Sequence, residues 1–417
     1  MKQLTKKRIL SLILALCICI SFIFSSCGKD NNSSGSSSNS PSINASGTLG
    51  ETPDKQLGLY VENGVVMLGG KPFYGIGTNY HDIAFRYITD PIADDFEKGL
   101  KNLADYKIPY VRVRFSSYGG EGMDLFKENK DLFFRGMDKC VELCEKYKIG
   151  IIAVLAWTTT PYRTGTESDT DFLTTVDSEG FQLMVEYMKA IINRYKNSPA
   201  IWGWEVGNEY NLACNIPPNN LDPNALSSFY DYISKIIRET DGSGRTINTG
   251  NSQNRFASKH LMDAGSWEAD SKEDMKYMLE MYNSENMSIT STHVYNTTQG
   301  VAGKQVSISE YLKMMTDFCK EMGKPLYIGE YCDDEKIITE EESLAKFQKL
   351  HDAILENDIQ LATIWSYNNY TDNYARLPDY VKYMLNEGKK ANEKFTSDGK
   401  QDIDSYWNST KNVVYAG

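Results

Sequence analysis

The sequence lacks a cysteine framework and any metal-type cysteine pattern. Its 417 residues include 8 cysteines and 4 histidines, with no CxxC pair and no Cys/His cluster. This absence argues against a zinc site, and we expect no metal and no other cofactor. After the N-terminal region an odd number of cysteines remains: Cys140, Cys144, Cys214, Cys319 and Cys332. We therefore predict a fold that disulfides do not hold, with Cys140 and Cys144, at helical spacing, packed in a core.

Phosphate-binding loops and excess basic charge are also missing. No GxGxxG or GxxxxGK[ST] motif follows an apolar run, so nothing indicates nucleotide binding. Lys and Arg number 44 against 56 Asp and Glu, which gives a net charge of −12. Removal of residues 1–26, which hold four basic residues and no acidic one, would make it −16. Nucleic acid is therefore not an expected partner, and a neutral substrate fits better.

The first residues have the layout of a secretory signal. Four basic residues precede an apolar stretch at 9–24, which is short for a membrane span. Ser25 and Ser26 then precede Cys27, as at a bacterial lipoprotein cleavage site, although Phe24 stands where Leu is usual. We predict a lipoprotein-type signal over 1–27 with Cys27 lipidated. An ordinary signal peptide cut nearby, or an uncleaved anchor, is the alternative.

A linker and one large domain follow. Residues 28–56 are rich in Ser, Asn and Gly, a composition that cannot bury enough surface to become ordered. We expect a flexible tether there and a single domain over 57–417. A lipid anchor would place this domain on the extracellular face of a bacterial cell membrane, and without it the protein would be secreted. We expect a monomer.

Short apolar runs alternate with amphipathic helical segments through this domain. This alternation predicts an α/β protein of the (β/α)₈ TIM barrel type, and a doubly wound open sheet is the alternative. A hairpin is expected at 58–74, before the first main strand. The main strands are predicted at 73–79, 109–115, 150–157, 200–208, 245–251, 289–295, 325–330 and 361–367.

Two of these runs end on a glutamate. Glu209 follows the fourth run and Glu330 ends the seventh. In a (β/α)₈ barrel the carboxyl ends of the strands build the active site, so the two carboxyl groups should face one mouth. A lone strand-end Glu is often a surface charge or a helix cap, but two across one cavity are what glycoside hydrolysis requires. Their environments must also push their pKa values apart, so that one stays protonated near neutral pH.

Other residues near the strand ends support this hypothesis. Arg112 would favour an ionised carboxylate, or would merely fill the barrel as an internal ion pair. Aromatic residues make up 12% of the chain, and Trp157 and Trp365 are candidate platforms for sugar rings. Trp202 and Trp204 lie deeper and are expected in the core. Glu205, four residues before Glu209, should also lie deeper and pair with an Arg.

The segment "RYKNSPAIWGWEVGNEYN" resembles the strand-four signature of glycoside hydrolase family 5 and its relatives in clan A. Those enzymes are retaining (β/α)₈ glycanases, including cellulases and β-mannanases. The resemblance extends over residues 57 to about 375. It includes "GKPFYGIGTNYHD", "PYVRVRF", "STHVYN", "PLYIGEY" and "IWSYNN", which resemble strands one, two, six, seven and eight.

The resemblance implies roles at the reacting centre. Glu209 would be the acid/base and Glu330 the nucleophile. Tyr295 would hydrogen-bond the nucleophile, and His293 would lie near the acid/base. Arg112, preferred over Arg114 by its match to a V-R-[IV] pattern, would keep Glu330 ionised.

The resemblance also implies substrate contacts. Asn208 would bond the sugar 2-hydroxyl, and Trp365 would form the floor under that sugar. Asn79 and Trp157, at other strand ends, are further candidate substrate contacts. Many cellulases of the family end strand three with His. Here it ends "VLAWTTT", so that Trp157 occupies the region, which is more similar to the mannanase branch.

The sequence therefore predicts retaining hydrolysis of β-1,4 bonds in a plant-type polysaccharide, with β-mannan the first guess and β-glucan the second. An exo-acting β-glycosidase or a transglycosylase on the same scaffold is one alternative. A non-catalytic carbohydrate-binding surface lipoprotein is another. The acidic stretch "CDDE" at 332–335 is expected to be a solvated loop or helix start, with a substrate contact or calcium site as the alternatives.

Overall fold

The computed structural model describes residues 56–89, 95–116, 120–163, 168–216, 220–332, 339–367 and 377–411. Cys27, the signal segment and nearly all of the linker lie outside this part of the chain. Residues 333–335 of the acidic stretch also lie outside it. The domain boundaries, the lipid anchor and the location of the protein therefore stay predictions.

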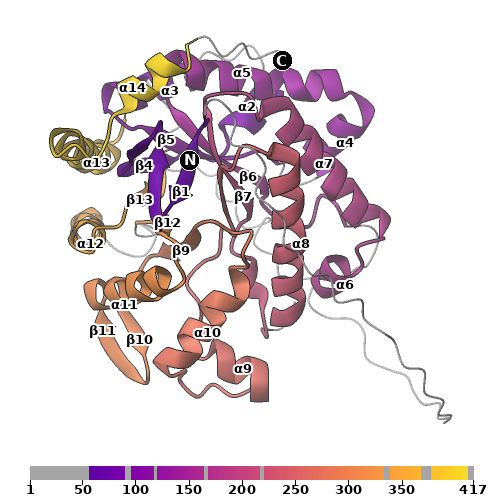
Figure 1. Cartoon of the computed structure of the whole chain (residues 1–417), viewed down its shortest axis with the longest axis vertical. Coiled ribbons are helices and arrows are strands. Elements are labelled where there is room, and N and C mark those ends of the chain that lie inside the picture. Colours follow the sequence, from indigo (N-terminus) through magenta and orange to yellow (C-terminus); the bar gives the residue numbers. More distant parts are fainter. Residues whose placement is uncertain are drawn as a thin grey trace, which may run out of the picture. The chain divides into compact units, whose positions relative to one another are not determined.

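Eight parallel strands form the centre of the structure (Figure 1). Each coincides with one of the predicted runs, and every position along them is buried, as expected for strands covered on both faces. The strands are β4 (Gly75–Asn79), β5 (Tyr110–Arg114), β6 (Gly150–Ala156), β7 (Ile201–Gly207), β8 (Thr246–Asn248), β9 (Thr290–Val294), β12 (Leu326–Tyr331) and β13 (Leu361–Ile364).

The sheet closes on itself. Its order is β8-β7-β6-β5-β4-β13-β12-β9, so β13, the last strand of the barrel, pairs with β4, the first. The two remaining edges meet where the backbone N–H of Gly250 and Asn251 donate to the Ser291 hydroxyl, at 3.0 and 3.2 Å. This closure excludes the doubly wound sheet and confirms the predicted (β/α)₈ barrel.

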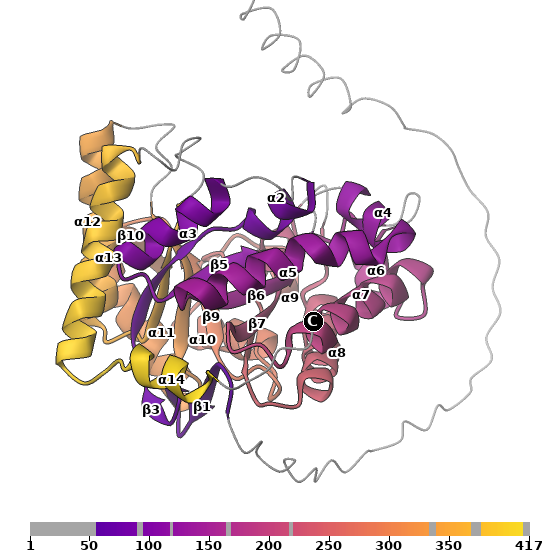
Figure 2. The same cartoon turned by 90° about the horizontal axis from the view of Figure 1, so that it is seen from above.

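Helices surround the barrel (Figures 1 and 2). Figure 2 shows α12 and α13 along one side and α5 and α7 along another. The helices are α2 (Ile83–Thr89), α3 (Asp95–Asp105), α4 (Gly120–Glu128), α5 (Lys130–Tyr147), α6 (Asp169–Thr174), α7 (Glu179–Tyr195), the 3₁₀ turn η1 (Tyr210–Ala213), α8 (Pro223–Asp241), α9 (Ser258–Ala264), α10 (Lys272–Tyr282), α11 (Ile308–Glu321), α12 (Glu340–Glu356), α13 (Asp379–Ser397) and α14 (Ile403–Ser409).

Two small antiparallel sheets lie outside the barrel. The predicted N-terminal hairpin is present and gains a third strand, in the order β1 (Leu59–Glu62), β2 (Val65–Leu68) and β3 (Lys71–Pro72). The second sheet, β10 (Thr298–Val301) and β11 (Lys304–Ser307), was not predicted. It follows β9 directly, so it stands beside the carboxyl ends of the barrel strands.

Large side chains fill the space inside and beneath the strands. The Tyr110 hydroxyl donates to the carbonyl of Ala362 at 2.9 Å, and a Cβ at Gly77 would lie 2.6 Å from the Tyr110 ring. Trp202 and Trp204 are fully buried, as predicted. Glycine at position 77 is thus required by the size of its neighbour rather than by its own backbone.

The five cysteines in the described part of the chain are all free and buried. Cys140 and Cys144 lie on the buried face of α5, which confirms their predicted place in the core. Burial raises the pKa of the Cys214 and Cys319 thiols to about 12. Within the described residues, no helix has both the length and the apolar character needed to cross a membrane.

Candidate active site

A buried arginine organises the carboxyl ends of the strands. Arg112 on β5 is fully buried and lies between Glu205 on β7 and Glu330 on β12, with nitrogen–oxygen distances of 2.5 and 2.6 Å. Burial alone would lower the pKa of Arg112, but the charges of the two carboxylates raise it. The guanidinium therefore stays cationic, and a buried charge is tolerated because it is paired on both sides. The predicted pairing of Glu205 with an Arg is confirmed.

Two asparagines accept the remaining guanidinium hydrogens. The side-chain oxygens of Asn79 and Asn208 lie 3.0 and 2.7 Å from Arg112 nitrogens. The Asn79 amide nitrogen also donates to the carbonyl of Gly329 at 3.1 Å, and Asn79 is fully buried. This corrects the expectation that Asn79 contacts the substrate, because its buried side chain is bonded to Arg112 and Gly329 instead. Asn208, which is partly exposed, stays a candidate contact.

Glu330 is held on both of its oxygens. Oε1 accepts from Arg112, and Oε2 accepts from the Tyr295 hydroxyl. Burial and the neighbouring Glu330 charge raise the pKa of Tyr295, so its proton stays in place as a donor. Only 4% of the Glu330 side chain is exposed. These contacts fix the direction of the carboxylate.

Glu209 turns out of the end of β7 into a more open position. Its backbone is in the left-handed region, with φ of 56°, and its N–H donates to the carbonyl of Gly250 at 2.8 Å. A side chain at Gly250 would place Cβ 2.0 Å from the Gly207 carbonyl oxygen, so only glycine allows this approach. The Glu209 side chain is 26% exposed, against 4% for Glu330. Of the two carboxylates, Glu209 is the more exposed.

The pKa of Glu209 is set by opposing effects. Burial is the largest single influence and raises it, but the hydrogen bond and charge of His293, together with Ser252 and Arg112, lower it by more in total. The His293 Nδ1 and Glu209 Oε1 atoms lie 2.8 Å apart. The pKa of Glu209 is therefore below its ordinary value. This differs from the expectation that one of the two acids stays protonated near neutral pH, because the combined effects of His293, Ser252 and Arg112 outweigh burial.

The two carboxylates face each other closely. One oxygen of each lies within 4.8 Å of the other and of a ring nitrogen of His293. Such a group could hold a metal ion, but its atoms already have partners. The guanidinium of Arg112 lies 2.6 Å from Glu330, and a cation there disfavours a second cation. The other acidic cluster in the described residues, around Asp270, is likewise occupied by hydrogen bonds from His260.

Stacked rings form one wall of the site. The ring of His81 is parallel to that of Trp365, with centroids 5.1 Å apart, and stacks at 5.8 Å on Trp157. Trp365 is partly exposed and can offer a face to a sugar. Trp157 is 6% exposed, and Arg112 lies over its ring at 4.9 Å. The expected platform at Trp157 is therefore corrected, because its ring supports Arg112 and His81 rather than facing the cavity.

Two residues of the site were missed in the sequence. His81 follows Asn79 by two residues, just past a strand end, a position that could have drawn attention to it. Burial, followed by Arg114 and Arg112, lowers the pKa of His81 to about 3, so that its ring is neutral. Ser252 bonds Glu209 from the segment after β8, and no local pattern indicates this.

Comparison with known families decides what this arrangement is. The family described as cellulase (glycosyl hydrolase family 5) matches residues 69–371. The chain belongs to glycosyl hydrolase family 5. This matches the resemblance inferred from the strand-four segment. As a member of this family the protein is a retaining β-glycoside hydrolase, and the family implies a polysaccharide as its class of substrate.

Solved structures share the fold of this family 5 chain. An endo-1,4-β-mannanase from Rhizomucor miehei has a TM-score of 0.60 at 17% identity, covering 81% of this chain and 99% of its own. An exo-β-1,4-mannosidase from Opitutaceae bacterium strain TAV5 has a TM-score of 0.57 at 14% identity, covering 82% of this chain and 63% of its own. An endocellulase from Pyrococcus horikoshii has a TM-score of 0.52 at 14% identity, covering 80% of this chain and 100% of its own. At these identities the likeness shows the barrel alone. No curated protein matches the chain.

Proposed function

We propose that this protein is an endo-acting, retaining β-1,4-glycanase with Glu330 as nucleophile and Glu209 as acid/base. The observation that carries the proposal is the approach of the two carboxylate oxygens to within 4.8 Å. Retaining enzymes hold their carboxyl groups about 5–5.5 Å apart, whereas inverting enzymes leave roughly 6.5–9.5 Å for a water molecule. Both residues emerge at the carboxyl ends of barrel strands, where this fold carries its chemistry.

The contacts of the two acids support their separate roles. Glu330 is aimed by Arg112 and Tyr295, so a carboxylate oxygen of Glu330 attacks the anomeric carbon while the bond to the leaving oxygen breaks. Glu209 gives its proton to that oxygen. In the second step water gives a proton to Glu209 and attacks the anomeric carbon, and the bond to Glu330 breaks. The Asn208 amide nitrogen remains available for the sugar 2-hydroxyl.

β-Mannan is the first substrate proposed and β-glucan the second. The basis is the end of β6, where the chain has Trp157 and the family's cellulases often have His. Activity on mannan, glucomannan, xylan, lichenan and carboxymethylcellulose would rank these polymers directly. Product analysis on a defined hexasaccharide separates endo action, which gives mid-length fragments first, from exo action, which releases one end product throughout.

Glu330→Ala is the first test of the mechanism. We expect hydrolysis to fall by at least about a thousandfold with the fold intact, because the attacking atom is gone. Glu186→Ala, an exposed glutamate on α7, is the matched control and should keep wild-type activity. Reducing-end release measures both. A Glu330→Ala protein as active as wild type would overturn the assignment and favour a binding role for this cavity.

Azide separates the two roles. In Glu330→Ala, azide should attack an aryl β-glycoside from the face opposite the leaving group and form the α-glycosyl azide. In Glu209→Ala, the covalent intermediate still forms on Glu330, and azide should then give the β-glycosyl azide. Product stereochemistry by NMR reads out each case. The reverse pattern would exchange the roles of the two residues.

A further inference from the structure

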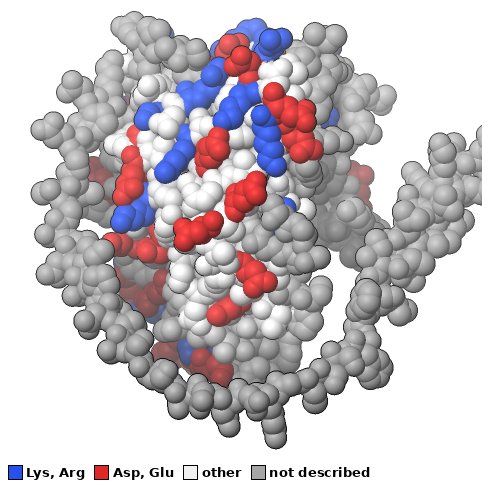
Figure 3. Space-filling view, turned by 90° about the vertical axis from the view of Figure 1, so that its right-hand side faces the viewer, with Lys and Arg blue, Asp and Glu red and all other residues white. Residues whose placement is uncertain are grey.

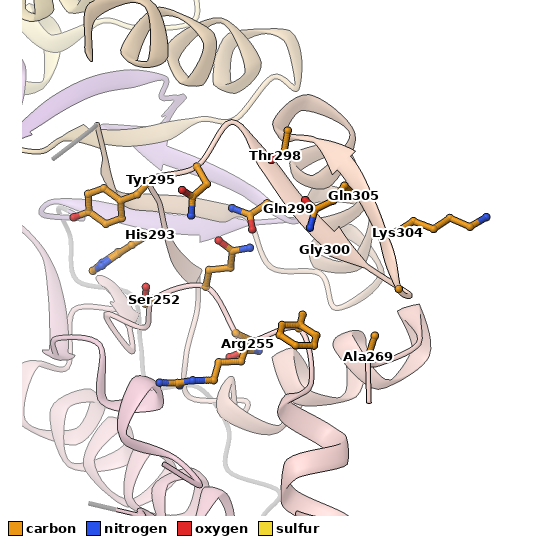
Figure 4. Close-up of a pocket in the computed structure, with 15 residues that line it drawn as sticks. Ser252, Arg255, Ala269, His293, Tyr295, Thr298, Gln299, Gly300, Lys304 and Gln305 are labelled. Atoms are coloured by element: carbon orange, nitrogen blue, oxygen red, sulfur yellow. The ribbon is translucent and has the colours of Figure 1, made fainter. Parts of the chain in front are cut away.

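A cavity of about 620 Å³ opens from the candidate active site between the segment after β8 and the β10–β11 hairpin (Figure 4). Its inner end is formed by His293 and Tyr295, which contact Glu209 and Glu330. Its outer end is formed by Phe256, Ala269 and the hairpin. The volume is within the usual range for ligand sites. The mechanism above uses only the inner end.

The position of Glu209 tells which half of a substrate would enter this cavity. An acid/base protonates the leaving oxygen, so the leaving chain extends from its side of the site. Both His293 and Ser252 contact Glu209, and both line the cavity. Trp365 and Trp157, in contrast, are not among the residues that line it. The cavity therefore begins where the leaving part of the substrate begins.

The lining has the chemistry of a site for uncharged hydroxyl groups. No Asp or Glu is among its residues, although the chain as a whole is acidic. Of its two cations, Arg255 donates to the Leu212 carbonyl at 2.7 Å, and Figure 4 shows Lys304 pointing away from the cavity. Five amide side chains line it, each able to donate and accept hydrogen bonds as sugar hydroxyls require. They are Gln253, Asn254, Asn296, Gln299 and Gln305.

Gln299 is the most informative of these amides. It is only 8% exposed, and its amide nitrogen has no hydrogen-bond partner among the described residues. Figure 4 shows this side chain reaching from β10 toward the part of the cavity where Tyr295 lies. A buried donor without an acceptor is costly unless a ligand supplies one. A hydroxyl of a bound sugar would do so.

An exposed aromatic pair stands at the outer end. Phe256 and Trp267 are 46% and 56% exposed, and their ring centroids are 6.0 Å apart. Hydrogen bonds of Asp270 hold the loop that carries them. Its N–H donates to the Phe256 carbonyl at 2.8 Å, and its buried carboxylate accepts from the backbone N–H of Lys259 and His260. Exposed rings on a fixed loop at the rim of an amide-lined cavity offer flat faces to the C–H faces of a sugar.

We propose that this cavity binds the leaving chain of the glycan over more than one sugar unit, with Gln299 bonding an inner sugar and the Phe256–Trp267 pair stacking on an outer one. This inference rests on the proposed function. It makes the length of the leaving chain a determinant of rate. Substrates that end in an aryl group at the leaving side cannot use the outer contacts.

The test compares two substrates of different leaving groups. For each variant, kcat/KM is measured on β-1,4-mannohexaose or cellohexaose, whichever wild type cleaves faster, and on the aryl glycoside of the corresponding disaccharide. The kcat/KM on the hexasaccharide, divided by that on the aryl glycoside, should fall about tenfold in the Phe256→Ala/Trp267→Ala double variant. In Gln299→Leu, which keeps the size but not the donor, we expect a fall of about fivefold. Tyr277→Ala, 47% exposed on α10 and outside the cavity lining, is the control.

Each outcome has a distinct meaning. A ratio in the double variant equal to that of Tyr277→Ala, with wild type active on the hexasaccharide, would overturn the inference and leave the proposed function standing. A wild-type protein that cleaves neither substrate would overturn both. Thermal unfolding of each variant checks that the fold is kept, and the exposure of both rings makes large destabilisation unexpected.

Discussion

Arg112 is the buried cation on which the carboxylates of the site depend. It contacts Glu205 and Glu330 directly, and its charge lowers the pKa of Glu209 as well. One guanidinium inside the barrel thus interacts electrostatically with three carboxylates. The cost of burying this cation is offset by its pairing with carboxylates on both sides.

His293 controls the protonation of Glu209, which gives a pH prediction. Glu209 must carry a proton to act as an acid, so kcat/KM falls as pH rises through its pKa. His293→Ala removes the main influence that lowers this pKa and leaves burial, which raises it. We expect the alkaline limb of the kcat/KM profile to move up by about one pH unit.

A second variant grades this effect. Ser252 makes a smaller contribution in the same direction, so Ser252→Ala should move the alkaline limb upward by less than His293→Ala. Both profiles are measured on an activated aryl β-glycoside and on a natural oligosaccharide. An alkaline limb that stays in place, or moves to lower pH, would contradict the role given to His293.

Among the elements, the segments that follow β8 and β9 decide the shape of the site. Gly250 brings the first of them against the end of β7, and the β10–β11 hairpin forms the opposite wall of the cavity. Helix α9 and then helix α10 follow the first segment. The Ser271 hydroxyl accepts from the backbone N–H of Asp274, and the Asp274 carboxylate accepts from the backbone N–H of Ser271. This reciprocal cap fixes where the helix starts.

Ser271→Ala should therefore weaken the α9–α10 region. Loss of an N-cap side chain costs about 1 kcal/mol, because a helix-start N–H loses its acceptor. Ser271→Asn keeps a capping oxygen and is the matched control. Chemical denaturation measures the free energy of unfolding, and hydrogen exchange of the first turn of α10 locates the change. Equal stability of the two variants would show that the cap does not matter there.

At the scale of the whole molecule, the two ends of the described chain meet under the barrel. The Tyr406 hydroxyl on α14 accepts from the N–H of Gly58 at 3.0 Å and donates to the carbonyl of Pro199 at 2.7 Å. The Tyr406 ring also packs edge-on against Trp202. One side chain thus joins the start of the domain, the entry to β7 and the last helix.

Tyr406→Phe tests this connection. The ring stays, but two buried backbone groups lose their partner, and we expect the free energy of unfolding to fall by about 1–3 kcal/mol. Tyr232→Phe, on an exposed tyrosine of α8, is the control and should change little. Denaturant unfolding followed by tryptophan fluorescence is suitable, since Trp202 and Trp407 lie beside Tyr406. No difference between the two variants would contradict the role of this contact.

The surface charge fits a neutral substrate. Figure 3 shows acidic and basic side chains interspersed on the face that it presents, with no broad basic patch among the residues drawn in colour. The net charge of −12 points the same way. An uncharged polysaccharide is recognised by hydroxyl and ring contacts, so it does not require a charged docking face.

The strands and the place of the acids were predictable because they depend on local sequence. A buried parallel strand is a short apolar run, and the eight runs were found where the strands are. In a barrel, all strands run in the same direction, so side chains at their carboxyl ends lie at the same end of the barrel. That is why Glu209 and Glu330 could be expected in one mouth, and why Arg112 and Glu205 could be expected beneath it.

What could not be predicted depends on contacts between segments far apart in the chain. The burial of Asn79 and Trp157, the stacking of His81 on Trp365, and the lowered pKa of Glu209 each require a partner from another strand. The unpaired amide of Gln299 and the Phe256–Trp267 pair arise only once the hairpin and the loop after β8 lie opposite each other. Sequence alone determined the barrel and the two acids at its mouth, because the hydrophobic pattern and the strand ends can be recognised within short stretches of sequence. Only the tertiary structure decided their protonation and the cavity beside them, because burial and charge are summed over neighbours in space.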